Sequence, residues 1–223
     1  MPVFFDEMTA LFVHREARPD EAASHALQAL DVRGDLFQQV ASMTGENLQA
    51  ATREIDRMLG VDPEGGLLNL LAASVRLRAG DTQAAETHAV AAVRQLRGSP
   101  RAHATLADVR ATQREWREAA ASYREAIERS PETARPGIYR KLARCYTQLE
   151  QHGRAYSAMR NAVDAVSSDA KPADLYELAL SARRAGEESD ARQYLRFADL
   201  QTPPGNNEWR RRIDEALRAG GSE

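Results

Sequence analysis

Alanine returns at a nearly constant interval along this chain of 223 residues, and each alanine opens the same short pattern. An apolar or small residue follows four positions later, another follows three positions after that, and a residue at which a helix can end comes next. Spacings of four and three place all three side chains on one stripe of a helix. The intervals between the leading alanines are 34, 34, 36 and 36 residues, and the alanines are Ala51, Ala85, Ala119, Ala155 and Ala191.

A second recurring pair of residues lies roughly 12 positions before each leading alanine from Ala85 onward, one helix of about three turns upstream. Turn-forming or polar residues separate the two sets, as at Gly80-Asp81 and Gly186-Glu187. Each unit therefore reads as a helix, a short turn and a second helix. The four pairs are Ala72-Ala73, Leu106-Ala107, Leu142-Ala143 and Leu178-Ala179.

Small side chains at the points of contact let helix backbones approach closely, and a lone hairpin cannot bury its apolar face without neighbours. The composition agrees with this kind of packing. The hydrophobic fraction is 43% but the aromatic fraction is only 6%, so the core is built from alanine rather than from large rings. The sequence thus predicts hairpins stacked in an array.

The period and the residue types resemble the tetratricopeptide repeat (TPR). The unit with Leu106-Ala107, Trp116, Ala119 and Tyr123, followed by Ala126 and Pro131, is the most similar to it. The tryptophan of the family's first helix is replaced in every unit, by Asn69, His103, Tyr139 and Leu175. The resemblance is fullest over residues 66–203, continues over 32–65, and is slight over 3–31.

We therefore predict an all-α fold without strands: a right-handed superhelix (α-solenoid) of about six TPR-like helical hairpins plus a C-terminal capping helix. The predicted parts of this single continuous domain are an atypical N-terminal helical hairpin (1–31), the repeat array (32–205), and a capping helix with a frayed tail (206–223). The cap is expected at Asn207–Ala219, with Gly220–Glu223 frayed. Two extra residues are expected to lengthen the loop Glu132–Gly137 without adding an element, and another pair the loop Ser167–Pro172.

Catalytic and metal-binding patterns are lacking in the sequence. No two of the five histidines stand four residues apart, the lone cysteine, Cys145, has no nearby histidine, and no phosphate-binding loop or nucleophile motif occurs. We expect a packed thiol at Cys145. The prediction is a protein that is not an enzyme and that needs no metal and no cofactor.

The net charge is −3, so no overall field attracts nucleic acid. The densest basic run, Arg210-Arg211-Arg212, spreads around a helix at about 100° per residue and cannot form one flat patch. Nucleic-acid binding is the disfavoured alternative. The sequence has no run of about 18 apolar residues, so no membrane insertion is expected. The sequence has one cysteine and shows no leader pattern, so we predict a cytoplasmic, soluble protein. The arginine- and alanine-rich composition suggests that the protein is bacterial.

The resemblance implies that first helices line a concave groove that binds another protein or a peptide. The groove side is apolar in the early hairpins, polar in the middle and basic in the later ones. A partner with a hydrophobic anchor and an acidic stretch or C-terminal carboxylate would suit it. The candidate contact residues are Leu70, Leu77, Asp108, Thr112, Arg140, Lys141, Arg144, Tyr176 and Arg183.

Simpler interpretations stay open at this point. The first hairpin could cover the early apolar residues, and the arginines could be an ordinary solvated face. Arg140 and Arg144 resemble half of the carboxylate clamp of chaperone-binding TPR domains, but Ser74, Thr105 and Leu70 stand where the clamp's other residues should be. The leading hypothesis is a protein- or peptide-binding scaffold or adaptor. The alternative is a structural module that forms a homodimer through its apolar early face near Phe37.

Overall fold

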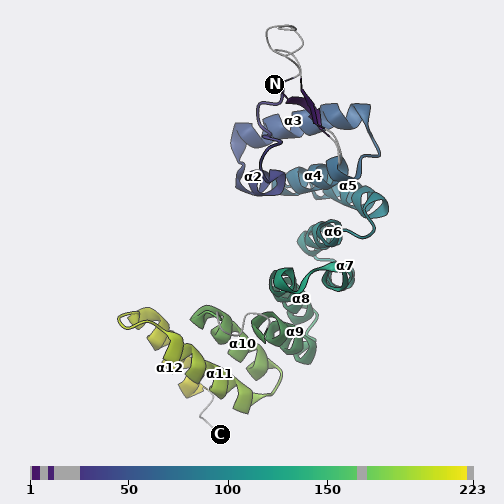
Figure 1. The fold of residues 1–223 in the computed structure, drawn as a ribbon. Helices are drawn as coiled ribbons and strands as arrows, with labels where there is room; N and C mark the ends of the chain where they lie inside the picture. Colours follow the sequence, from purple (N-terminus) through teal and green to yellow (C-terminus); the bar gives the residue numbers. More distant parts are fainter. Residues whose placement is uncertain (1, 6–9, 13–25, 165–169, 220–223) are drawn as a thin grey trace. The chain divides into compact units, whose positions relative to one another are not determined.

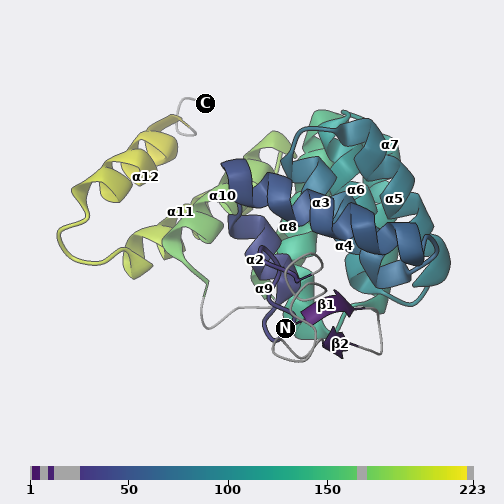
Figure 2. The same ribbon diagram turned by 90° about the horizontal axis from the view of Figure 1, so that it is seen from above.

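The computed structural model describes residues 2–5, 10–12, 26–164 and 170–219. Its contacts group the chain into two compact units, unit 1 (1–115) and unit 2 (116–223). Both units consist of antiparallel helices joined by short turns, so the all-α repeat fold is confirmed for nearly all of the described chain (Figures 1 and 2). The predicted boundaries at residues 31 and 205 stay predictions.

Unit 1 contains a short β-hairpin followed by helices of unequal length. The strands are β1 (Pro2–Phe5) and β2 (Ala10–Phe12). In Figure 1, α4 and α5 lie side by side, and α3 lies beside α4. The helices are α2 (Leu36–Ser42), α3 (Gly45–Val61), α4 (Gly66–Arg78), α5 (Thr82–Gln95) and α6 (Pro100–Thr112).

Unit 2 continues the same alternation. Helices α8 and α9 pair along their length, as do α10 and α11, and α9 also packs against α10. The helices are α7 (Trp116–Arg129), α8 (Arg135–Gln148), α9 (His152–Asp164), α10 (Pro172–Arg184), α11 (Glu188–Gln201) and α12 (Asn207–Ala219).

The alanine stripe forms the contact surface between helices, as predicted. All five leading alanines are at most 2% exposed. The residues four and seven positions after them are buried as well, from Ile55 and Met58 in α3 to Leu195 and Ala198 in α11. The first-helix pairs, such as Leu142-Ala143 and Leu178-Ala179, are buried on the facing helices. Because interiors are close-packed, these positions leave little room for a larger side chain.

The turn inside each hairpin has one conformation, repeated four times with the same period as the alanines. Its central residue has a positive φ, at Gly80, Arg114, Glu150 and Gly186. The next residue's N–H donates to a carbonyl five positions back, for example Asp81 to Arg76 and Gln151 to Tyr146. This is the Schellman arrangement, which satisfies the free carbonyls at a helix end. The polar turns at Arg114 and Glu150 thus fold as the glycine turns do.

The prediction of helices at the N-terminus was wrong for the residues that the structure describes there. β1 and β2 pair in an antiparallel manner, with Phe4 opposite Leu11 and Phe5 opposite Ala10. The run Val3-Phe4-Phe5 consists of β-branched and aromatic residues, which favour strands over helices. Residues 13–25 of the predicted N-terminal hairpin lie outside the described part.

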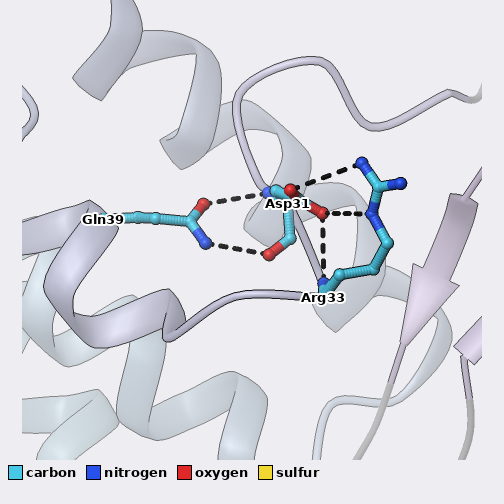
Figure 3. A network of polar contacts seen from close by, with 3 residues as sticks. All are labelled: Asp31, Arg33 and Gln39. Atoms are coloured by element: carbon cyan, nitrogen blue, oxygen red, sulfur yellow. Dashed lines mark hydrogen bonds and ion pairs between the residues drawn. The ribbon is translucent and has the colours of Figure 1, made fainter.

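Residues 26–35 form no helix, and hydrogen bonds connect them to helices α2 and α3 of the same unit. The carboxylate of Glu54 in α3 accepts three consecutive backbone N–H groups, those of Gln28, Ala29 and Leu30, at 2.6–3.1 Å. The Gln39 side chain accepts from the backbone N–H of Asp31 and donates to its carbonyl (Figure 3). The Arg33 guanidinium, also hydrogen-bonded to the Asp31 carboxylate, holds the pKa of that group below its ordinary value.

The predictions for the later linkers and for the C-terminal capping helix had different outcomes. α12 covers the predicted segment Asn207–Ala219, buries Ile213 and Ala216, and packs on α11. The loop at 132–137 does add an element: a 3-10 turn at Glu132–Ala134, with α8 already beginning at Arg135. Proline is favourable in the first turn of a helix, so Pro136 is the second residue of α8 and does not extend the loop. Most of the second linker and the tail 220–223 lie outside the described residues.

Candidate functional site

Unit 2 has a hollow of about 340 Å³ between α8 and α10, the first helices of two successive hairpins. Two facing helical rows form its walls, and Met159 of α9 also contributes to its lining. It is lined by Arg140, Ala143, Arg144, Thr147 and Gln148 of α8, Met159 of α9, and Ala173, Asp174, Glu177, Ser181 and Arg184 of α10.

Three arginines and two carboxylates give this hollow its chemistry. At one end, Arg140 Nη2 lies 3.0 Å from Asp174 Oδ1, so these two charges compensate one another. Arg144 and Arg184 are exposed, and neither has an ion-pair partner within the described ranges. A guanidinium in this state offers several N–H donors to a carboxylate from outside the molecule.

Local sequence explains why these side chains face each other. Arg140, Arg144 and Gln148 recur every four residues, and so do Glu177 and Ser181, with Arg184 three positions further on; each set forms one stripe of its helix. Arg184 lies in the last turn of α10, where a cation interacts favourably with the helix dipole. The turn after it, at Gly186, ends the helix, and the Arg184 side chain is exposed.

Two of the nine predicted contact residues, Arg140 and Arg144, line the hollow. Lys141 is exposed on α8 but is not part of the lining. Asp108 and Thr112 belong to α6 in unit 1, where the Thr112 hydroxyl donates to the Asp108 carbonyl at 2.9 Å. Glu177, Ser181 and Gln148 were not among the predicted contact residues, although Gln148 lies four residues after Arg144, and Ser181 and Glu177 lie three and seven residues before Arg184.

The predicted apolar end of the groove is closed by the chain itself. Leu70 is only 2% exposed, which leaves no surface for a partner, and Leu77 packs partly buried against a neighbouring cluster. Phe37 of α2 packs, partly buried, against the cluster formed by Leu70, Ala92 and Ala102, and the Arg101 guanidinium lies 4.3 Å from the centre of its ring. The prediction that Leu70 contacts a partner is therefore wrong, because α2 covers that surface.

Tyr176 and Arg183 contact other parts of unit 2 rather than the hollow. The ring of Tyr176 meets that of Trp209 in α12 edge-to-face, with centroids 5.5 Å apart. The Arg212 guanidinium lies over both rings, at 5.4 and 4.8 Å. Arg183 binds Glu188 through two hydrogen bonds of 2.9 and 3.1 Å across the α10–α11 turn, and these lower the pKa of Glu188.

Outside the hollow, two more titratable groups with shifted pKa values make contacts between helices of the fold. Tyr156 donates to the Asp190 carboxylate at 2.6 Å between α9 and α11, and burial together with this bond raises its pKa. His88 Nδ1 lies 2.9 Å from Asn69 Oδ1, and burial together with Arg76 lowers its pKa. The thiol of Cys145 is buried, as expected.

The described residues bring together no group of three side chains suited to a metal ion. None of their helices is both long and apolar enough to span a membrane.

No protein-family profile matches the chain, and no curated protein sequence matches it. Solved structures do resemble it. MamA from Desulfovibrio magneticus RS-1 has a TM-score of 0.62 at 15% identity, over 75% of this chain and 96% of that one. TTC0263, a TPR protein of Thermus thermophilus, has a TM-score of 0.55 at 16% identity, over 82% and 96%. PilF of Pseudomonas aeruginosa has a TM-score of 0.61 at 15% identity, over 78% and 82%.

These likenesses agree with the buried alanine stripe and with the four repeated turns. The chain has the tetratricopeptide-repeat fold.

Proposed function

We propose that this chain is a non-catalytic scaffold that holds a segment of another protein in the hollow between α8 and α10. Arg144 and Arg184 supply the main contacts, and an acidic side chain or a C-terminal carboxylate of the partner is what they bind. The observation that carries the proposal is the pair of exposed arginines on facing helices, neither of which has an ion-pair partner among the described residues. Arg140 keeps its bond to Asp174 and holds one end of the hollow in shape.

The fold supports a binding role rather than catalysis. Stacked hairpins present a long surface with few enclosed cavities, and this surface suits an extended segment better than a small substrate. Cytoplasmic localisation belongs to the same proposal, supported by the single buried cysteine, which fits a reducing compartment.

A binding titration with a labelled acidic peptide tests the proposal. The double variant Arg144→Glu, Arg184→Glu is expected to weaken binding by about tenfold or more, because attraction becomes repulsion at both contacts. The matched control is Arg117→Glu, Arg218→Glu, which reverses two exposed charges of unit 2 outside the hollow. Equal binding by wild type, double variant and control would refute the proposal.

Self-association is the second candidate function. In the face predicted for it, Phe37 is partly buried against the core of unit 1. The observation that favours it now lies on α11, where Phe197 is 44% and Leu200 is 79% exposed. Light scattering tests it: a dimer that dissociates in Leu200→Ser supports this interface, and a wild-type monomer at all concentrations removes it.

A further inference from the structure

We infer that the hollow between α8 and α10 selects a dipolar segment, with an acidic group for Arg144 and Arg184 and a basic side chain for Glu177. This inference rests on the proposed function and adds a second, opposite contact to it. The partner would then be defined by a pattern of two charges and not by acidity alone.

The wall formed by α10 carries charges of both signs. Glu177, Ser181 and Arg184 follow one another at spacings of four and three residues, and all three line the hollow. The neighbouring carboxylate, Asp174, is compensated by Arg140 at 3.0 Å. Glu177 is exposed, and none of the ion pairs formed within the described residues includes it. The wall therefore presents a negative charge near its middle and a positive charge at its end.

The spacing of these two charges sets the spacing required in a partner. Seven residues separate Glu177 from Arg184, which corresponds to about 10 Å along a helix. An extended segment rises by about 3.3 Å per residue, so it covers this distance in about three residues. A basic residue and an acidic residue three positions apart would reach both charges at once.

Segments of one charge fit less well. A wholly acidic segment that reaches Arg144 and Arg184 places a carboxylate close to Glu177, and like charges at such range repel. A wholly basic segment is repelled by Arg144 and Arg184, which carry charge of the same sign. Repulsion against the wrong partner is one of the two ways in which an interface gains specificity.

Three end-blocked, labelled peptides in each of two series, which differ at one position, test the inference by fluorescence anisotropy with the full chain. Each carries the same acidic residue, and the position three residues away is Lys, Gln or Glu. Two series place this position before or after the acidic residue, since either direction along the hollow satisfies the geometry. Wild type should bind Lys over Gln over Glu in at least one series, by about two- to fivefold per step, the usual range for exposed charge pairs.

The variant Glu177→Gln should abolish this ranking. It weakens binding of the Lys peptide and strengthens binding of the Glu peptide, and an opposite change of this kind is not produced by a general loss of structure. Glu118→Gln, an exposed position of α7 outside the hollow, is the control and should keep the wild-type order. Thermal melts of both variants should match that of wild type.

The outcomes separate the two proposals. Binding that requires Arg144 and Arg184 but whose ranking does not change in Glu177→Gln overturns the dipolar inference and leaves the scaffold proposal standing. If wild type binds none of the peptides, the proposed function falls and the inference falls with it.

Discussion

Unit 1 and unit 2 are built from the same hairpin but differ in what lies on the inner side of their first helices. In unit 1, Phe37 of the short helix α2 packs against Leu70, and Arg101 covers the ring. In unit 2, α8 and α10 leave a hollow edged by charged side chains. The repeat thus fixes the backbone, while a few side chains decide whether the inner surface is closed or open.

One repeat position shows the difference directly. Leu70 lies two residues before the pair Ala72-Ala73, and Arg140 lies two residues before Leu142-Ala143. The leucine is buried in the interior of unit 1, whereas the arginine side chain is one-third exposed and paired with Asp174. An apolar residue at this position is covered by a neighbouring helix, whereas a charged residue leaves the surface exposed to water.

The largest expected effect comes from truncating the two side chains at this shared position. Leu70→Ala should lower the free energy of unfolding by about 2–5 kcal/mol, because it leaves a cavity under Phe37. Arg140→Ala should lower it by less than about 1 kcal/mol, the usual range for a partly exposed ion pair. Urea unfolding measures both, and equal costs would contradict the division into a closed and an open inner face.

Ala126 tests a feature that both units share. It is fully buried in α7, so Ala126→Leu should overpack the contact between helices and cost about 1–3 kcal/mol. Ala121 lies on the exposed side of the same helix, and Ala121→Leu is the control with almost no expected effect. If Ala126→Leu melts at the same temperature as the control, the alanine stripe does not lie at the contact between helices.

The repeated turn predicts two substitutions with opposite signs. Gly186 has φ 86°, so Gly186→Ala forces an alanine into the left-handed region and should destabilise unit 2 by about 1–2 kcal/mol. Glu150 occupies the same turn position with φ 58°, so Glu150→Gly should relieve strain and stabilise by less than about 1 kcal/mol. Thermal unfolding compares the two, and changes of the same sign would disprove the equivalence of the turns.

The smallest effect concerns His88 in unit 1, between α4 and α5. Asn69 donates to the carbonyls of Pro63 and Gly65, so its oxygen is left to accept from His88 Nδ1. The pKa of His88 lies below its ordinary 6.5 because burial and Arg76 outweigh the carboxylates of Asp56 and Asp81. Below pH 6.5 the unfolded chain therefore binds more protons than the folded one, so stability is full above this pH and decreases as the pH falls through it.

Urea midpoints measured at several pH values, with His88→Gln as the comparison, check this expectation. The variant should lose less stability than wild type as the solution is acidified from pH 6.5. Parallel curves for the two proteins would show that His88 does not titrate in this way.

Most of the fold followed from the sequence because small residues at fixed intervals carry direct physical information. Ala85 and Ala119 had to be buried for the helices to approach. The N-terminus was mispredicted because the slight resemblance over residues 3–31 was read as a helical hairpin, while Val3, Phe4 and Phe5 favour a strand. The turn at Glu150 was located by the spacing of the repeat, but its positive φ could not be recognised from the residue type, because hydrogen bonds at the helix end impose this conformation.

The site was predicted less well than the fold, since periodicity shows which stripe a residue occupies but not what covers that stripe. Arg140 and Arg144 line the hollow between α8 and α10, and their contact with a partner stays a prediction. Leu70 occupies the corresponding repeat position of α4, yet contacts from α2 cover it. Tyr176 was assigned to the groove because nothing local indicates that Trp209, 33 residues later, would pack against its ring.

A map of amide chemical-shift changes on addition of an acidic peptide tests most directly whether the open hollow of unit 2 is the binding surface. We expect changes concentrated in α8 and α10, around Arg144, Ser181 and Arg184, with α2, α4 and α6 unaffected. Changes centred on Phe37, Leu70 and Arg101 would contradict it, because they would show that the closed face opens and binds instead.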